Sequence, residues 1–152
     1  MNIKAIIFDW GRTLFDVDTK KEMLDSEDVL SYCKQKGYKI CVASLVRANT
    51  TIEERTNQIK ALPLGKYIDM FEVSDVEDKD EMLNNLVRKL NLQKEELLFV
   101  DDRVVKSIKY GNKNNHPTIW LQKGPYANEL PNPETGVPTF TIKTLSELKN
   151  IL

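Results

Sequence analysis

The chain has 152 residues, of which 41% are hydrophobic and 30% charged, with a formal net charge of −1. This length and composition predict one soluble globular domain over residues 1–152. The balance of 22 basic against 23 acidic residues argues against a nucleic-acid footprint or a polybasic membrane patch. The N-terminal apolar run is too short for a signal peptide, and no apolar run of about 18 residues occurs. We therefore expect a cytoplasmic protein that binds neither nucleic acid nor membrane.

Short apolar runs alternate with helical patterns along the chain. The expected strands are residues 3–8, 39–43, 70–73, 97–100 and 118–121. The expected helices are residues 22–36, 51–62, 80–90 and 104–110, with a last short helix opened by Ser146. Residues 124–139 are rich in proline and glycine and are expected to form an ordered loop. This alternation predicts an α/β fold with a parallel sheet and right-handed crossovers.

The two cysteines and the single histidine carry no expected chemistry. Cys33 and Cys41 lie in a helical pattern and an apolar strand, which predicts small core residues in a reducing compartment. His116 precedes a proline in an Asn-rich stretch and is expected on the surface. A zinc site is not supported, because no C-x-x-C pair accompanies the lone histidine.

Polar residues stand at the ends of the predicted strands. These residues are Asp9, Ser44, Ser74 with Asp75, and Asp101 with Asp102. Ligands of open α/β sheets bind beyond the carboxyl ends of the strands. Carboxylates gathered at one edge would repel each other without a cation, and a hard ion such as Mg²⁺ is the natural partner for oxygen ligands.

The ordered motifs resemble the haloacid dehalogenase-like superfamily over about residues 3–121. Asp9-Trp10-Gly11-Arg12-Thr13-Leu14 resembles the first motif, Asp-x-Asp-x-Thr, and Val42-Ala43-Ser44 resembles the second. Lys79 fits the lysine of the third motif, and the strand ending in Asp101-Asp102 fits the fourth. The resemblance implies a three-layer Rossmann-like parallel sheet with helices on both faces.

The resemblance also implies roles for these residues. Asp9 would be the nucleophile that forms an aspartyl-phosphate, and Lys79 would offset the charge of Asp9 and of the transferring group. Mg²⁺ would be held by Asp9, the backbone carbonyl of Gly11, Asp102 and the adjacent Asp101. This reading makes the protein a magnesium-dependent phosphatase.

The substrate side of the site is less strongly marked. Ser44 would donate a hydrogen bond to a phosphoryl oxygen, or would only start the following helix. Thr13 would hold the turn after Asp9, and Arg47 and Arg103 are within reach of the same face. Arg103 would steer an anionic substrate or lie free on the surface. Lys89 is a poorer candidate than Lys79 for the third motif.

No cap domain fits into the chain. The segments between Leu14 and Ser44 and between Ser44 and Lys79 have room for only one helix each, with a short strand in the second. The resemblance is thus to the capless branch, whose open site suits a phosphorylated macromolecule or a partner chain that acts as a lid. The loop from residue 124 to 138 is an alternative cover. A small-molecule substrate and a homo-oligomer are both compatible with the sequence.

Gly11 departs from the phosphatase motif. The family's phosphatases have at this position an aspartate that protonates the leaving oxygen and activates water, worth about 10²- to 10⁴-fold in rate. Three hypotheses follow: a slow or specialised phosphatase with Asp16 or Asp18 as a substitute, another chemistry of the superfamily, or a non-hydrolytic module that binds phosphate, metal or a protein. The second hypothesis is weakened because phosphonatases use a cap lysine and dehalogenases need no magnesium.

Overall fold

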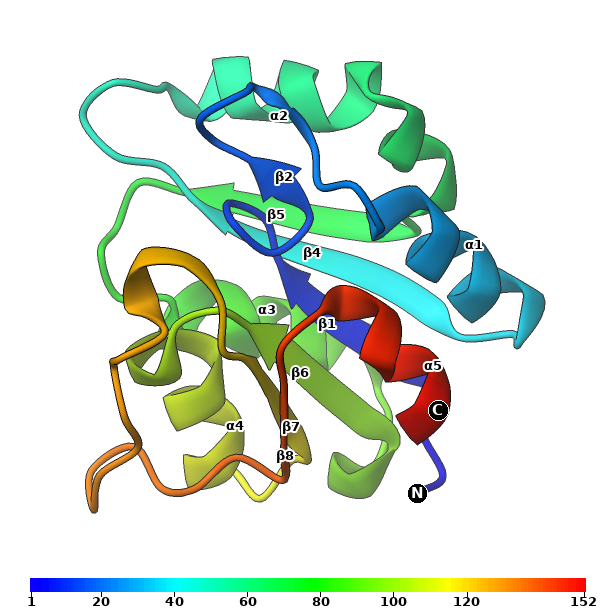
Figure 1. The fold of residues 1–152 in the computed structure, drawn as a ribbon, viewed down its shortest axis with the longest axis vertical. Coiled ribbons are helices and arrows are strands. Elements are labelled where there is room, and N and C mark those ends of the chain that lie inside the picture. The colour runs from blue at the N-terminus through cyan, green and yellow to red at the C-terminus, as the bar shows by residue number, and fades with distance from the viewer.

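The computed structural model describes residues 1–152 as an α/β fold built on one six-stranded sheet (Figure 1). All neighbouring strands pair in parallel, in the order β5-β4-β1-β6-β7-β8. The bounds are β1 (Ala5–Asp9), β4 (Lys39–Leu45), β5 (Met70–Ser74), β6 (Leu97–Asp101), β7 (Thr118–Leu121) and β8 (Phe140–Ile142). This confirms the predicted parallel sheet.

Helices cover both faces of the sheet (Figure 1). Side chains of α1 (Ser26–Gln35), α2 (Ile52–Ala61) and α5 (Leu148–Ile151) join the core on one face. Those of α3 (Asp80–Leu90) and α4 (Lys109–Lys113) join the core on the other. This confirms the three-layer architecture expected for the superfamily.

Local sequence explains where the best-predicted helices begin and end. Helix α2 starts with a capping box, in which the Thr51 hydroxyl accepts the Glu54 N–H at 3.0 Å. Helix α3 buries Met82, Leu83 and Leu86 at helical spacing, and it ends at Asn91 in the left-handed conformation (φ +49°).

The alternation of side chains along β1 decides what each strand end presents. Ile6 and Phe8 enter the core under α1 and α2, whereas Ala5 and Ile7 enter the core under α3. Because side chains alternate along a strand, Asp9 follows Ile7 toward the α3 face. The buried strand β6 lies beside β1 and ends in Asp101 at the same edge of the sheet.

Two expected helices have other bounds in the structure. The helix expected over residues 22–36 begins only at Ser26, because residues 21–22 form a strand. The helix expected over residues 104–110 is interrupted by a non-helical backbone at Lys106, and α4 continues to Lys113.

Three further features differ from the sequence-based expectations. A two-stranded hairpin of β2 (Phe15–Asp16) and β3 (Lys21–Glu22) and the edge strand β8 were not predicted, because each is too short to show a period. The surface position expected for His116 is wrong. Its ring is buried and lies 5.0 Å from the Phe99 ring, and its Nδ1 donates a hydrogen bond to the Lys94 carbonyl at 2.9 Å.

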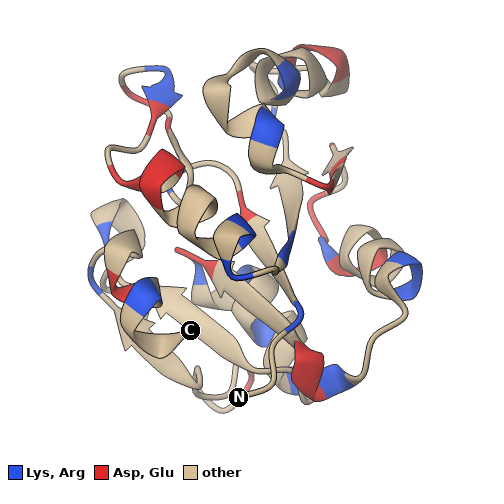
Figure 2. Cartoon of the chain, turned by 90° about the vertical axis from the view of Figure 1, so that its right-hand side faces the viewer, with Lys and Arg blue, Asp and Glu red and all other residues tan.

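The connections around the site are short. Between β1 and β4 the chain forms only the β2–β3 hairpin and α1, and between β4 and α3 only α2, a 3₁₀ turn and β5. No additional domain is therefore inserted in either of the two segments in which a cap was considered from the sequence. None of the helices has the length and apolar character needed to cross a membrane. In the view of Figure 2, acidic and basic positions are interspersed over the elements.

Candidate active site

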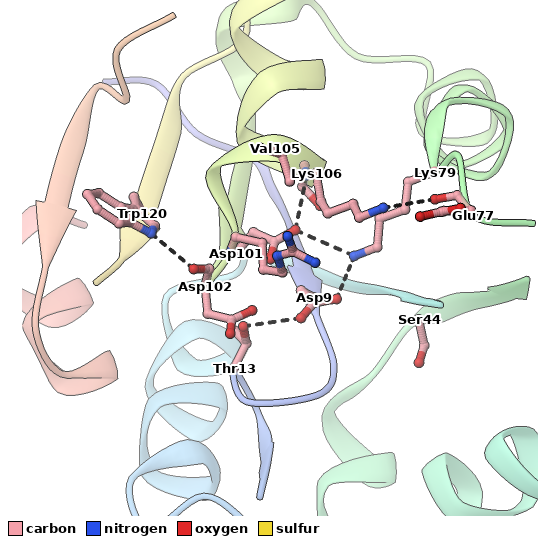
Figure 3. Close-up of polar contacts among 12 residues, drawn as sticks. Asp9, Thr13, Ser44, Glu77, Lys79, Asp101, Asp102, Val105, Lys106 and Trp120 are labelled. Atoms are coloured by element: carbon pink, nitrogen blue, oxygen red, sulfur yellow. Dashed lines mark hydrogen bonds and ion pairs between the residues drawn. The ribbon is translucent and has the colours of Figure 1, made fainter. Parts of the chain in front are cut away.

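Three carboxylates meet where β1 and β6 end. Asp9, Asp101 and Asp102 each offer an oxygen, and these oxygens lie within 4.8 Å of one another. All three residues are buried, and they come from two adjacent parallel strands. The structure therefore brings together the acidic residues that the sequence placed at one sheet edge (Figure 3).

Lys79 supplies the positive charge of this cluster. It immediately precedes α3 and is only 4% exposed, although its sequence neighbours are mostly acidic surface residues. Its Nζ lies 2.5 Å from Asp9 Oδ1 and 3.5 Å from Asp101 Oδ2. Lys89 instead pairs on the surface with Glu72, so Lys79 is the lysine that reaches the cluster.

Burial and like charge disturb the ionisation of the cluster. Burial and the neighbouring Asp101 raise the pKa of Asp9 from 3.8 to about 6, despite its contact with Lys79. Burial and the charges of Asp9 and Asp101 raise the pKa of Asp102 from 3.8 to about 9. Burial opposes the charge of Lys79, but Asp101 and Asp9 outweigh it and raise the lysine pKa. The three carboxylates are paired with only one lysine, so the cluster lacks positive charge.

Asp101 and Asp102 differ in how their oxygens are used. Asp101 accepts the backbone N–H groups of Arg103 and Ser107, at 2.9 and 3.0 Å. One carboxylate oxygen of Asp102, Oδ2, is buried and has no hydrogen-bond partner. An unpaired buried carboxylate oxygen is costly, and a hard divalent cation would satisfy it. The donor set therefore fits Mg²⁺, with Asp102 the freest ligand and Asp101 largely fixed by the backbone.

The turn after β1 is held by its own backbone. The N–H groups of Thr13 and Leu14 donate to the Trp10 carbonyl at 3.2 and 2.9 Å, and Arg12 takes the left-handed conformation (φ +62°). The Thr13 hydroxyl, fully buried, donates to Asp9 Oδ2 at 3.4 Å. Thr13 thus lies against the Asp9 carboxylate, opposite Lys79 (Figure 3).

Ser44 is placed apart from the carboxylates. Its side chain points away from Asp9 and Lys79 in Figure 3, and its Oγ accepts a hydrogen bond from Nη1 of Arg55 at 2.6 Å. Arg55 lies on α2 and was not singled out from the sequence, because helical periodicity alone marks it as an ordinary polar position. Burial lowers the pKa of Arg55, while the charge of Asp9 raises it, which indicates that the two charges interact.

A cavity of about 500 Å³ opens over the carboxylate cluster. Gly11 lines it together with Asp9, Asp101 and Asp102. Basic residues also line it and outnumber the three acidic ones: Arg12, Arg47, Arg55, Lys79, Arg103 and Lys106. This excess of positive charge favours an anionic ligand.

The loop that follows β7 forms one wall of the cavity. Tyr126 lies in this loop and lines the cavity, with the Arg103 guanidinium 3.9 Å from its ring centroid. Arg103 Nη2 also contacts Glu129 Oε2 at 2.7 Å. Arg103 is therefore neither a free surface residue nor free to follow a ligand, since it ties the loop to the end of β6.

The cavity contains no substitute for the missing acid-base residue of the first motif. It has no histidine, and its only carboxyl groups are the three of the cluster. Asp16 accepts the N–H groups of Asp18 and Thr19 in its own turn, and neither Asp16 nor Asp18 lines the cavity. A side chain at position 11 would have room, because a Cβ there would meet only Val17 Cγ1, at 3.4 Å.

Comparison with known proteins identifies the family and the fold. A model of the haloacid dehalogenase-like hydrolases matches residues 5–111. A search of curated proteins by sequence gives no match.

Among solved structures, the fold is similar to an uncharacterized protein of Listeria monocytogenes serotype 4b, with a TM-score of 0.77, 20% identity, and coverage of 98% of this chain and 96% of that one. It is also similar to the putative HAD-hydrolase YfnB of Bacillus subtilis, which was solved with bound magnesium, with a TM-score of 0.79, 14% identity, and coverage of 100% and 99%. A predicted phosphatase of Clostridium acetobutylicum gives a TM-score of 0.74, 17% identity, and coverage of 99% of both chains.

Proposed function

Because the chain belongs to the haloacid dehalogenase-like hydrolase family, we propose that it is a magnesium-dependent phosphohydrolase that works through an aspartyl-phosphate at Asp9. The observation that supports this most is the meeting of Asp9, Lys79 and the Asp101–Asp102 pair at the floor of a cation-lined cavity. A phosphate monoester brought into this cavity would face the Asp9 carboxylate directly.

The protein residues divide the work of phosphoryl transfer. An Asp9 oxygen attacks phosphorus, and the bond from phosphorus to the leaving oxygen breaks. Lys79 orients Asp9 and, as a fixed cation, balances the charge that develops on the phosphoryl oxygens. Thr13 holds the second oxygen of Asp9 and so fixes the direction of attack. Arg47 and Arg55 are the proposed contacts to the substrate. Ser44, for which a direct hydrogen bond to the phosphoryl group was expected, does not line the cavity and is instead proposed to position Arg55.

Asp9, Asp102, Asp101 and the backbone of Gly11 are the proposed magnesium site. The cation would supply electrostatic stabilisation of the phosphoryl group when bound. The unpartnered oxygen of Asp102 and the raised pKa of Asp102, about 9, both support a missing positive charge at this position.

Gly11 makes the expected enzyme slow on ordinary esters. Without a proton donor the leaving oxygen departs with its charge, and without a base the water that attacks the aspartyl-phosphate is not activated. The same observation favours a second candidate function, a binding module that holds phosphate and metal without turnover. The two candidates differ only in whether bond cleavage occurs.

Hydrolysis of p-nitrophenyl phosphate with and without Mg²⁺ separates the candidates. Aryl phosphates need little protonation of the leaving group, so wild-type protein is expected to release p-nitrophenol in the presence of the metal. Asp9→Asn is expected to abolish this, with a loss of about 10³-fold or more. Asp16→Asn is the matched control outside the cavity and should keep the activity. Wild-type turnover no higher than that of Asp9→Asn would leave only the binding module.

A further inference from the structure

The cavity carries more positive charge than one phosphoryl group requires. Lys79 is neutralised by Asp9 and Asp101, and Arg103 is paired with Glu129. The other cavity cations, Arg12, Arg47, Arg55 and Lys106, have no carboxylate within 4.0 Å. Surface cations are often unpaired, but four unpaired cations around one cavity are an unusual concentration of like charge.

Two of these cations show that the charge is built into the cavity. Arg55 has a buried Nε without a hydrogen-bond partner, while its Nη1 is fixed by Ser44. A buried guanidinium N–H without a partner is costly, so a ligand oxygen that accepts it would be stabilising. Arg12 takes a left-handed backbone (φ +62°), which is unfavourable for a non-glycine residue and is typical of functional turns.

The second observation is that the cavity lacks a well-matched acid to protonate a leaving oxygen. Apart from the three clustered carboxyl groups, its proton-bearing side chains include the hydroxyl groups of Thr50 and Tyr126 and the ammonium groups of Lys79 and Lys106, which are far weaker acids than an aspartic acid. An alcohol leaves poorly under these conditions, since its pKa is close to that of water, about 15.7. A phosphate group has a second pKa of about 6 and can leave as an anion.

We propose that the substrate is a phosphoanhydride, in which the terminal phosphoryl group is transferred to Asp9 and a second phosphate leaves toward Arg12, Arg47 and Arg55. This proposal rests on the proposed function and specifies its substrate class. It accounts for both observations: the second phosphate uses the unpaired cations, and its departure needs no proton donor.

Hydrolysis of the phosphoanhydride through Asp9 needs no reactant other than water. An oxygen of Asp9 forms a bond to the terminal phosphorus, and the bond from that phosphorus to the bridging oxygen breaks. The bridging oxygen keeps the electron pair and departs as part of the second phosphate. Water then adds to the phosphorus, the bond to Asp9 breaks, and inorganic phosphate and a proton are released while the carboxylate is restored.

Three probes separate the effect of a good leaving group from the effect of a second phosphate. Glycerol 3-phosphate has a poor leaving group and one phosphate, p-nitrophenyl phosphate has a good leaving group and one phosphate, and pyrophosphate has a good leaving group and a second phosphate. With Mg²⁺ in excess over each probe, kcat/KM is expected to be largest for pyrophosphate and smallest for glycerol 3-phosphate. Hydrolysis of p-nitrophenyl phosphate with a lower or absent rate for pyrophosphate would overturn the phosphoanhydride while leaving the proposed phosphohydrolase intact.

Arginine variants test the position of the second phosphate. Arg47→Ala is expected to lower kcat/KM for pyrophosphate about tenfold more than for p-nitrophenyl phosphate, because a charge-assisted contact to the second phosphate is lost. Arg88→Ala removes an exposed arginine of α3 outside the cavity and is the matched control. Equal losses for the two substrates in Arg47→Ala would contradict the proposed position.

A binding measurement covers the case in which no probe is turned over. Calorimetry on Asp9→Asn with Mg²⁺ is expected to give pyrophosphate at least about tenfold tighter binding than inorganic phosphate, and Arg47→Ala in the same background should remove this difference. If no probe is hydrolysed but pyrophosphate still binds more tightly than inorganic phosphate, only the proposed hydrolytic activity is contradicted. Equal affinities for pyrophosphate and phosphate would overturn the phosphoanhydride proposal whatever the activity.

Discussion

The edge of the sheet holds its charges differently on the two sides of β1. Toward β6, Asp9 and Asp101 share Lys79, Asp101 also accepts two backbone N–H groups, and one oxygen of Asp102 is buried without a partner. Toward β4 and the turn after β1, Arg12, Arg47 and Arg55 line the cavity without a carboxylate partner. On the β6 side, Asp9 and Asp101 already have their partners within the protein, whereas the arginines on the β4 side have positive charge available to bind an anionic ligand.

Removal of Lys79 should have the largest effect on the β6 side. Lys79→Ala leaves Asp9 and Asp101 buried without their cation, and loss of one partner of a buried ion pair costs about 3–5 kcal/mol. We expect a loss of that size in the free energy of urea unfolding at neutral pH, together with loss of hydrolysis. Lys89→Ala, which breaks an exposed pair with Glu72, should cost no more than about 1 kcal/mol. Similar costs for both variants would show that the cluster is not held by Lys79.

Magnesium should stabilise the fold more at alkaline than at acidic pH. In metal-free protein the pKa of Asp102 is raised from 3.8 to about 9, so between these values the folded state holds a proton that the unfolded state has lost. Stability in EDTA is therefore expected to fall as the pH rises from 5 to 8. Added Mg²⁺ should raise the melting temperature more at pH 8, where it has fewer protons to displace from Asp102 and from Asp9, whose pKa is about 6.

The control for this effect is Asp102→Asn. This variant removes the group with the larger pKa shift, so most of the decline with pH in EDTA and most of the stabilisation by Mg²⁺ should disappear, and only the smaller contribution of Asp9 below about pH 6 should remain. A metal effect that is the same at the two pH values, or that survives in Asp102→Asn, would contradict the assignment of Asp102 as a ligand.

Restoring a carboxyl group at position 11 should raise the rate of hydrolysis. Gly11→Asp is accommodated sterically, because the new Cβ would contact only Val17 at 3.4 Å. A well-positioned general acid-base group raises the rate about 10²- to 10⁴-fold, and for an introduced aspartate whose position is not optimised we expect a gain in rate of at least about tenfold. The gain is expected to be greater for glycerol 3-phosphate than for p-nitrophenyl phosphate, whose leaving group needs no proton. Gly11→Ala controls for the added bulk and should give no gain.

The smallest effect is expected at the loop that forms the cavity wall. Arg103→Ala removes the pair with Glu129 and the contact to the Tyr126 ring, both partly exposed, at a cost of about 1 kcal/mol. Hydrogen exchange should speed up for residues 124–130 and remain unchanged in β6. Unchanged exchange in the loop would show that Arg103 does not hold it.

Regular, strongly patterned elements were predictable from the sequence. Helix α3 has the predicted bounds, 80–90, because its buried positions recur with a helical period, and strand β7 has the predicted bounds, 118–121, because it is a short, continuously buried run. The position of the carboxylates at one edge of the sheet was also predictable, because Asp9 and Asp101 end apolar runs whose carboxyl ends share an edge in a parallel sheet. That β1 and β6 are neighbours, which brings these side chains into contact, came from the structure. Hairpin β2–β3 and strand β8 were not, since two or three residues show no period.

Other properties depend on contacts between distant segments. Burial of His116 against Phe99 and Tyr110 follows from packing of α4 on β6, which the Asn-rich sequence around it does not indicate. The hydrogen bond from Arg55 to Ser44 depends on the rotation of α2 above β4. The direction of the Ser44 side chain could likewise not be predicted, because it depends on the register of β4 against β1.

A phosphoenzyme trap tests the central claim most directly. Because Gly11 leaves no base to activate water, dephosphorylation of Asp9 is expected to be slow, and the aspartyl-phosphate should accumulate during turnover of p-nitrophenyl phosphate. Acid quenching followed by mass spectrometry of the peptide that contains Asp9 should show a phosphoryl group in wild-type protein, less of it in Gly11→Asp, and none in Asp9→Asn. Turnover without a phosphoryl group on Asp9, or turnover that persists in Asp9→Asn, would contradict the account.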